Sequence, residues 1–313
     1  MSLIRTAFIL GAGLGTRLGG LTARRPKPLI PVRNRPLICS AFDHLLGVGM
    51  ERLVVNTFWQ AHRYGEFFPA PSYGGAELLF REETPEVLET AGGIWNVRDL
   101  LRDESFIVYN GDIFTDLPLE KAIWAHEEQG NEATLILRSK GGPLRVGFDI
   151  DGQCVTDIGR PIGVLGSRQF LFTGIYLLSP EFIRRIPPAT KIGVVAIFRE
   201  MLRSGVRIGG VVIDDGDWWD LGSREEYLGV HAHLAGGESG TAGWIDPSAE
   251  IGPGVKISGA TAIGAGAKIG RGAKLHDCLV WENAEVAAGA DLSRCIVTRG
   301  LVADGKRVDF DFA

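Results

Sequence analysis

The 313-residue chain is short of cysteine, of long apolar runs and of net positive charge. Its four cysteines form no CxxC pair, so we expect reduced thiols in a cytoplasmic protein: Cys39, Cys154, Cys278 and Cys295. No apolar stretch approaches the roughly 20 residues of a membrane span, and no signal peptide stands at the N-terminus. The net charge of −5 argues against general nucleic-acid binding. We therefore expect neither a membrane nor a nucleic acid as partner.

What the chain has is enough length for about two domains, with 45% hydrophobic residues to form their cores. Up to residue 237, apolar strand-like runs alternate with helical stretches. Strands are expected at 52–57, 106–112, 133–138, 170–179 and 207–214, and helices at 36–49 and 119–130. This alternation predicts a Rossmann-like α/β domain over 1–237 with a mostly parallel central sheet. Ligands of such sheets bind at the carboxyl ends of the strands.

A different period begins after a glycine-rich linker at 235–243. An aliphatic residue recurs every sixth position, at Ile245, Ile251, Ile257, Ile263, Ile269 and Leu275. This hexapeptide repeat predicts a left-handed parallel β-helix over 243–313, with small residues at its corners. The pattern fades after Trp281, which predicts about three coils and then a capping coil. Exposed edges and flat faces predict a homo-oligomer assembled through this domain.

The stretch "GAGLGTRL" at 11–18 follows a first strand and predicts a phosphate-binding loop. A dinucleotide fingerprint requires a third glycine where Thr16 stands, and the GxxxxGK[ST] pattern of a P-loop is absent. Six basic residues without any acid follow the start of the loop: Arg17, Arg24, Arg25, Lys27, Arg33 and Arg35. They form either a solvated basic face or a site for a small polyanion.

The continuation "GTRLGGLTARRPKPLIPV" is more specific. It contains GxGxRL, a following Thr and PKPLxPV, and so resembles the sugar-1-phosphate nucleotidyltransferases, also called NDP-sugar pyrophosphorylases. The resemblance implies a nucleotidyltransferase domain at 1–237. It also implies Mg²⁺-dependent transfer of a nucleotidyl group from an NTP, GTP or UTP, to a sugar 1-phosphate, with release of pyrophosphate.

The resemblance assigns roles within this loop and beyond it. Backbone N–H groups of five residues would wrap the triphosphate: Gly11, Ala12, Gly13, Gly15 and Thr16. Arg17 and Lys27 would neutralise the leaving pyrophosphate, although either could be a surface cation. Asp112 in "NGD" and Asp220 in "DWWDLG" would hold Mg²⁺, which favours few protein carboxylates together with phosphates and water. The alternative for each aspartate is a structural carboxylate, such as a turn former.

A base-binding loop is expected in "EETPEVLETAGGI" at 82–94. Gly92 and Gly93 would admit the base close to the backbone, and Glu86 would read its edge. A carboxylate only accepts hydrogen bonds, so it matches both N1–H and N2–H of guanine but only N3–H of uracil. The loop therefore favours GTP, unless Glu86 is a solvated loop acid.

The sugar pocket departs from the usual family pattern. The common "EKP" is "GRP" here, with Gly159 and Arg160, and the common "NAGIY" is "FTGIY", with Phe172 in place of Asn. These departures resemble the N-acetylmuramate-1-phosphate uridylyltransferases, whereas the repeat domain resembles the mannose-1-phosphate guanylyltransferases. Sugar-phosphate contacts are expected from Gly147, Arg160, Thr173 and Lys191, with Lys191 equally consistent with a surface lysine.

Two functions of other classes remain open. A β-helix can carry acyl transfer in trimers, and His276 is the single histidine among the repeats. A non-catalytic regulatory homologue is the other possibility, against which the presence of Arg17, Lys27, Asp112 and Asp220 argues.

Overall fold

The computed structural model describes residues 4–159, 168–236 and 244–313. It forms two compact units, one of residues 1–14 with 38–219 and the other of residues 15–37 with 220–313. The phosphate-loop sequence therefore begins in the first unit and continues in the second. Arg160 and most of the predicted linker lie outside the described residues, and the predicted domain limits of 1–237 and 243–313 stay predictions. Within the described segments, no helix combines the length and apolarity that crossing a membrane requires.

The first unit is built on a ten-stranded sheet, counted over the described residues, with the order β10-β11-β13-β9-β12-β7-β1-β4-β6-β5. The strands are β1 (Thr6–Leu10), β4 (Arg52–Thr57), β5 (Ser72–Tyr73), β6 (Ala76–Glu82), β7 (Phe106–Asn110), β9 (Ala133–Arg138), β10 (Val146–Asp149), β11 (Cys154–Ile158), β12 (Arg168–Leu178) and β13 (Gly209–Val212). A short separate pair joins β8 (Ile113–Thr115) and β14 (Trp218–Asp220). The α/β prediction is confirmed, and all five predicted strands are present.

The prediction of a mostly parallel sheet holds for part of it. Strands β7, β1, β4 and β6 run parallel, as do β9 and β13. In contrast, β12 is antiparallel to both β7 and β9, and it also pairs antiparallel with β10. At the two ends of the sheet, β11 is antiparallel to β10 and β13, and β5 is antiparallel to β6. The sheet is therefore mixed. An apolar run such as β12 is buried in either direction, so sequence pattern alone does not distinguish the two.

Helices accompany the strands of the first unit: α1 (Leu37–Gly47), α2 (His62–Phe67), α3 (Glu89–Asn96), α4 (Glu120–Gln129), α5 (Pro180–Ile183) and α6 (Val194–Arg203). The core joins Phe8 and Val108 of the central strands to Phe182 and Phe198 of α5 and α6, all fully buried. Helix α6 packs with an apolar face that recurs at helical spacing, through Val194, Ile197, Phe198 and Met201.

The carboxyl end of the parallel strands is where the predicted site begins. Leu10 pairs in register with Asn56 on one side and with Asn110 on the other. The residues that follow, Gly11 and Gly111, therefore leave the sheet side by side, and the Gly111 N–H donates to the carbonyl of Leu10 over 3.1 Å. The close approach demands glycine at 111, since a Cβ there would stand 2.6 Å from that carbonyl oxygen.

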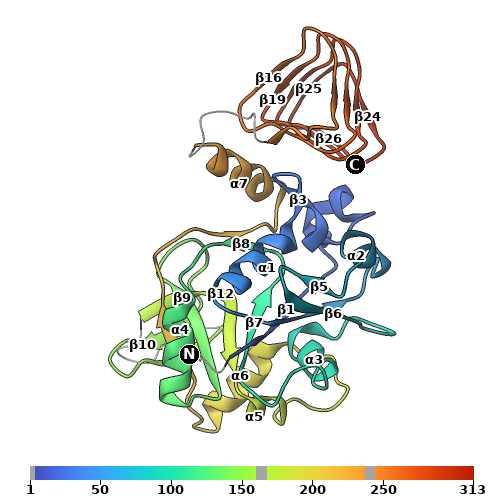
Figure 1. Ribbon diagram of the computed structural model, residues 1–313. Coiled ribbons are helices and arrows are strands. Elements are labelled where there is room, and N and C mark those ends of the chain that lie inside the picture. Colours follow the sequence, from blue (N-terminus) through green and yellow to red (C-terminus); the bar gives the residue numbers. More distant parts are fainter. Residues whose placement is uncertain (1–3, 160–167, 237–243) are drawn as a thin grey trace. The chain divides into compact units, whose positions relative to one another are not determined.

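The second unit contains the segment 15–37, helix α7 (Arg224–Gly236) and the repeat domain. The segment holds two short 3₁₀ helices, η1 (Thr16–Thr22) and η2 (Lys27–Leu29), and a small hairpin of β2 (Pro31–Val32) with β3 (Arg35–Pro36). The repeats form a parallel β-helix whose coils stack as three four-stranded sheets, drawn from orange to red in Figure 1. The β-helix prediction is confirmed.

The number of coils agrees with the sequence pattern. The described strands form four coils: β15 (Glu250–Ile251), β16 (Lys256–Ser258) and β17 (Ala262–Ile263); β18 (Lys268–Ile269), β19 (Lys274–His276) and β20 (Leu279–Val280); β21 (Glu285–Val286), β22 (Asp291–Ser293) and β23 (Ile296–Val297); β24 (Val302–Ala303), β25 (Lys306–Val308) and β26 (Asp311–Phe312). The sequence predicts about three coils followed by a capping coil, which together make four. Parallel pairing continues through the region where the hexapeptide pattern fades.

The repeat fades from the sequence because successive coils differ in length. Ile257 pairs with Leu275, Leu275 with Leu292 and Leu292 with Arg307, so the spacing between stacked positions shortens along the β-helix. The corners keep their conformation: positive φ recurs at glycines from Gly254 to Gly305 and is also adopted by non-glycine residues such as Asp277. The strands therefore continue to stack after the strict six-residue period is lost.

Candidate active site

In the second unit, two predicted cations lie beside one predicted carboxylate. Asp220 lies 3.6 Å from Nη2 of Arg17 through Oδ2 and 3.5 Å from Nζ of Lys27 through Oδ1. The Lys27 side chain is only 6% exposed, whereas that of Arg17 is 66% exposed. A largely buried cation needs a partner, and Asp220 supplies it for Lys27 while remaining one-third exposed itself.

Local geometry explains how the loop presents these cations. Gly15 has a φ of 64°, and a Cβ there would stand 3.0 Å from Cβ of Lys27. The Thr22 hydroxyl closes the loop by donating to the carbonyls of Gly15 and Gly19, at 3.0 and 3.2 Å. Gly15 is thus required both for its backbone conformation and for the room that Lys27 occupies. Thr16 begins η1 and is exposed.

Gly222 is a residue of this site that the sequence did not single out. A Cβ at this position would stand 2.3 Å from Nη1 of Arg17. Its N–H donates to the carbonyl of Asp220 over 2.7 Å, which turns the chain directly after the carboxylate. The "DLG" spacing is the sequence signal that could have identified it.

In the first unit, a buried hydrogen-bond network anchors the start of the phosphate loop. The N–H of Gly11 donates to Oδ1 of Asn56 over 2.8 Å, and Nδ2 of Asn56 donates to Oε1 of Glu83 over 2.7 Å. The other oxygen of Glu83 accepts the N–H of Leu88 at 2.7 Å. The network joins the phosphate loop to the predicted base loop. Burial raises the pKa of Glu83, against the lowering effect of these two donors.

This network corrects the role predicted for Gly11. Its N–H is bound to Asn56 and its carbonyl accepts the Tyr64 hydroxyl at 2.9 Å, so Gly11 fixes the loop instead of facing a phosphate. A Cβ at Gly11 would lie 2.6 Å from the carbonyl oxygen of Asn56. Ala12 is also buried, whereas Gly13 is exposed with open space around it. Gly13 is therefore the first loop residue whose surroundings leave room for a ligand.

Asp112 occupies the turn between β7 and β8 and is half-buried. The residue before it is Gly111, which leaves the sheet beside Gly11, so Asp112 lies at the carboxyl edge that the sequence predicted. Among the described residues, no group of three or more His, Cys, Asp or Glu side chains could hold a metal ion. Mg²⁺ accepts a few carboxylate oxygens together with phosphates and water, and Asp112 in the first unit and Asp220 in the second each offer such oxygens.

The predicted base reader and one predicted sugar-phosphate contact pair with each other. Nζ of Lys191 donates to Oε2 of Glu86 over 2.9 Å, and both side chains are exposed. The hydrogen bond to Glu86 raises the pKa of Lys191. Gly92 in α3 does not face open space, because a Cβ there would stand 2.5 Å from the carbonyl oxygen of Thr190. Its N–H donates to Ile192, so Gly92 packs the base loop against the segment that carries Lys191.

The remaining sugar-site predictions fall on the β10–β12 region. Thr173 is buried, and its hydroxyl donates to the carbonyl of Ile136 over 2.8 Å and accepts the N–H of Ile175. Its described contacts are therefore structural. Gly147 is buried beside β11, where a Cβ would lie 2.8 Å from Oγ1 of Thr156. Arg160 lies outside the described residues.

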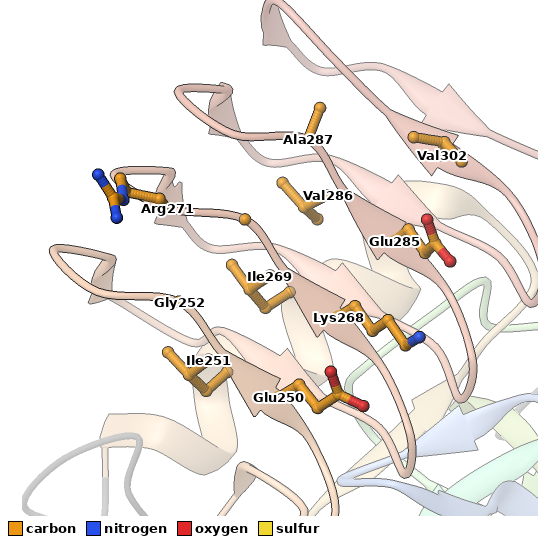
Figure 2. Close-up of a pocket in the computed structure, with 11 residues that line it drawn as sticks. Glu250, Ile251, Gly252, Lys268, Ile269, Arg271, Glu285, Val286, Ala287 and Val302 are labelled. Atoms are coloured by element: carbon orange, nitrogen blue, oxygen red, sulfur yellow. The ribbon is translucent and has the colours of Figure 1, made fainter.

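A hollow of about 530 Å³ lies on the outer face of the β-helix, along β15, β18, β21 and β24 (Figure 2). Its recess follows a column of small residues, Gly252, Gly270 and Ala287. Glycine is forced at the first two, since a Cβ on Gly270 would stand 2.4 Å from the backbone nitrogen of Ala288. The hollow results from the stacking of the coils. None of the predicted site residues lines it. His276 lies on another face and contacts Ser258 through Nδ1 at 3.0 Å.

Comparisons with known proteins identify the family of the chain. A family model described as nucleotidyl transferase matches residues 6–236. A probable mannose-1-phosphate guanylyltransferase 1 of Oryza sativa subsp. japonica is 30% identical over 310 residues, which cover 94% of this chain and 81% of that protein. The mannose-1-phosphate guanylyltransferase catalytic subunit beta of Drosophila pseudoobscura pseudoobscura is 27% identical over 269 residues, 79% and 71% of the two chains.

Among solved structures, a UDP-glucose pyrophosphorylase from Acinetobacter baumanii superimposes with a TM-score of 0.64 at 16% sequence identity. The match covers 76% of this chain and 95% of that chain. At this identity the likeness concerns the fold.

Proposed function

We propose that this chain, which belongs to the nucleotidyl transferase family and is a sugar-1-phosphate nucleotidyltransferase, transfers the guanylyl group of GTP to mannose 1-phosphate. The relatives named mannose-1-phosphate guanylyltransferase support the choice of substrates, and one of them aligns over 94% of the chain. The products are GDP-mannose and pyrophosphate.

The arrangement of Arg17, Lys27 and Asp220 is the observation that supports this reaction best. Asp220 pairs with both cations, one through each carboxylate oxygen, so a net positive charge is left at this place. A triphosphate presents several anionic oxygens that compete with Asp220 for the same two cations. A guanidinium can contact two phosphate oxygens as a fork, and the largely buried ammonium acts as a point charge. The pair is therefore suited to stabilise negative charge that develops on departing pyrophosphate.

The chemistry requires no protein nucleophile. An oxygen of the ionised sugar phosphate attacks the α-phosphorus of the NTP, and the bond from that phosphorus to the bridging oxygen of pyrophosphate breaks. The electron pair of this bond stays on pyrophosphate, whose charge Arg17 and Lys27 offset. Positioning and charge neutralisation are the main contributions that a protein makes to phosphoryl-type transfer. Gly13, Gly15 and Thr16 would supply backbone N–H groups to the triphosphate.

Asp112 and Asp220 would hold the divalent cation, Mg²⁺, for which their oxygen donors are suited. When bound, this ion supplies positive charge to the phosphates. Asp220 would then have to leave one or both of its cation partners, which frees Arg17 and Lys27 for the triphosphate.

The choice of base is supported by Glu86. The choice of sugar is supported by the names of the relatives. Lys191 donates to one oxygen of Glu86, and a carboxylate, which only accepts hydrogen bonds, matches guanine better than uracil or adenine. The alternative is an N-acetylmuramate-1-phosphate or other hexose-1-phosphate uridylyltransferase, which Gly159 and Phe172 favour. Assembly as a homo-oligomer through the β-helix and a cytoplasmic location stay predictions.

The test is pyrophosphate release from the full chain with Mg²⁺, using GTP and UTP in all pairings with mannose, glucose and N-acetylmuramate 1-phosphates. The highest kcat/KM is expected for GTP with mannose 1-phosphate. A higher value for a UTP pair would establish the alternative. No turnover with any pair would contradict both and favour the regulatory homologue, and consumption of acetyl-CoA in parallel would indicate acyl transfer.

A further inference from the structure

The β-helix contacts the cation-bearing segment through a buried ion pair. Arg25 stands two residues before Lys27, and its side chain is 8% exposed. Its guanidinium meets both carboxylate oxygens of Glu282, with Nη1 3.1 Å from Oε2 and Nη2 in still closer contact with Oε1. Two parallel N–H···O bonds between planar groups fix direction as well as distance. Arg25 therefore holds one orientation instead of extending toward solvent.

The indole of Trp281 also contacts the guanidinium of Arg25. The guanidinium carbon lies 4.8 Å from the ring centroid, within the range of a cation–π contact. Trp281 and Glu282 follow β20 at a corner of the β-helix. The N–H of Trp281 donates to Val297 of the next coil, and that of Asn283 donates to Ala265 of the preceding coil. The residues on both sides of Glu282 are thus hydrogen-bonded to neighbouring coils, which holds its backbone in place.

Two prolines transmit the position of Arg25 to Lys27. Pro26 and Pro28 flank the lysine, and their rings fix φ at both positions. The N–H groups of Leu29 and Ile30 donate to the carbonyls of Pro26 and Lys27, which closes η2. The fixed φ of Pro26 and the hydrogen bonds of η2 leave few rotatable backbone bonds between Arg25 and Lys27, so the position of one restrains the other.

The far end of the segment is attached to the β-helix as well. Nδ2 of Asn34 donates to the carbonyl oxygens of Trp244 and Ile263, at 2.5 and 2.8 Å. One amide thus bonds the backbone at two points of the second unit. Lys27 lies between two attachments, the ion pair at Arg25 and the amide at Asn34, so its backbone is restrained from both sides.

We propose that Glu282, acting through Arg25, is a positioning residue that sets Lys27 for the triphosphate. The β-helix would then be part of the nucleotide site and not only an assembly module. The proposal rests on the proposed function in one respect, the binding of triphosphate by Lys27. Glu282 also neutralises Arg25, which keeps that cation from pairing with Asp220 or with the ligand in place of Lys27.

The first measurement is direct binding of inorganic pyrophosphate and of GTP to the full chain by titration calorimetry. Glu282→Gln is expected to weaken both about tenfold, since small misplacements of a binding group cost up to about 10²-fold. The matched control is Asp291→Asn, which removes another β-helix carboxylate, one that lies 3.8 Å from Lys274 with both side chains exposed. The control is expected to bind like the unsubstituted chain.

The second measurement separates positioning from general damage. In the pyrophosphate-release assay, Glu282→Gln should raise KM for the NTP about tenfold and leave KM for the sugar 1-phosphate within about twofold. An equal rise in both constants, or an unchanged KM for the NTP, overturns the proposal. Weaker pyrophosphate binding by Glu282→Gln in a chain that turns over no substrate pair would refute the proposed function while supporting the positioning role.

Loss of one partner leaves the other buried charge uncompensated, so Glu282→Gln can fail to fold. Glu282→Asp keeps the charge on a shorter side chain and serves in that case. It should fold, as checked by its thermal unfolding, and weaken pyrophosphate binding by a smaller factor than tenfold, about threefold. Binding by folded Glu282→Asp equal to that of the unsubstituted chain overturns the proposal.

Discussion

The two compact units hold their parts of the phosphate-loop sequence by different physical means. In the first, Gly11 is bound by neutral donors and acceptors, with its N–H on Asn56 and its carbonyl on Tyr64. In the second, Arg17 and Lys27 are held by the charge of Asp220. Both backbone polar groups of Gly11 already have partners within the protein, so these hydrogen bonds fix the conformation of the loop. Ion pairs can exchange one anion for another, so they suit the proposed binding of a triphosphate.

The largest expected effect comes from removing a carboxylate in either unit. Asp112→Asn and Asp220→Asn should each lower kcat about 10²- to 10³-fold, because each removes charge from the proposed Mg²⁺ site. The measurement is pyrophosphate release over a Mg²⁺ titration, in which both variants should require more metal. Asp103→Asn, an exposed acid of the first unit, is the control. Unchanged activity in Asp112→Asn would make the metal assignment wrong.

Within the second unit, the buried cation should matter more than the exposed one. Lys27→Met is expected to reduce kcat/KM about 10²-fold and Arg17→Met about tenfold, since a desolvated charge interacts more strongly. Lys27→Arg should not restore activity, because the side chain is 6% exposed and leaves no room for a larger group. Arg24→Met is the matched control, an exposed cation of the same segment. Equal losses at 17 and 27 would contradict the distinction.

Each unit also has a buried histidine, and both should destabilise the fold in acid. Burial lowers the pKa of His126 and His231 to about 4, below the ordinary 6.5. The unfolded chain then binds more protons between pH 6.5 and 4, so stability is present above 6.5 and is lost as the pH falls. Each site contributes at most about 3 kcal/mol.

Urea unfolding at pH 7 and at pH 4.5 measures this loss. His126→Gln and His231→Gln should each flatten the pH dependence, the first through the unit with the sheet and the second through the unit with the β-helix. A pH dependence as steep as that of the unsubstituted chain would show that these histidines are not its source.

The smallest of these effects is expected at Glu83, which shapes the loop without contacting ligand. A glutamine at this position would present an amide nitrogen to one of two donors, Asn56 or Leu88, and cost about 1–3 kcal/mol of folding stability. Thermal and urea unfolding would measure it, with Glu82→Gln, an exposed neighbour, as control. KM for the NTP should rise by less than the tenfold expected for Glu282→Gln, because Glu83 acts on the loop only through Asn56 and Leu88. An unchanged stability would mean that the network relaxes around glutamine.

Local patterns predicted much of this fold. The strands at 52–57 and 133–138 match β4 and β9 residue for residue, because a buried strand is a contiguous apolar run. The hexapeptide period predicted the β-helix, but it fades over the last coils, where parallel pairing nevertheless continues and corners turn at glycine and non-glycine residues alike, such as Gly289 and Arg294. A repeat in space needs only the right φ at each corner, and several residue types supply it.

The sequence predicted the charged residues of the candidate site, but it did not predict the residues that hold the surrounding backbone. Arg17, Lys27, Asp112 and Asp220 were expected to form one site. The first two and Asp220 meet in the second unit, whereas Asp112 belongs to the first. The sequence did not indicate Asn56, Glu83 or Gly222. Their roles depend on the distant groups that they contact in the folded chain. The assignment of Gly92 to the base was made from the residue type, whereas its close neighbour is Thr190.

The sequence by itself determined the phosphate loop, the cations within it and the presence of a β-helix, since each is encoded by neighbouring residues. Only the tertiary structure decided which distant groups stand beside them. Asn56 and Glu83 bond across 27 residues, and Arg25 and Glu282 across 257. Hydrogen bonds and ion pairs of this kind form because buried polar groups require partners, and the chain's path alone determines which partner is within reach.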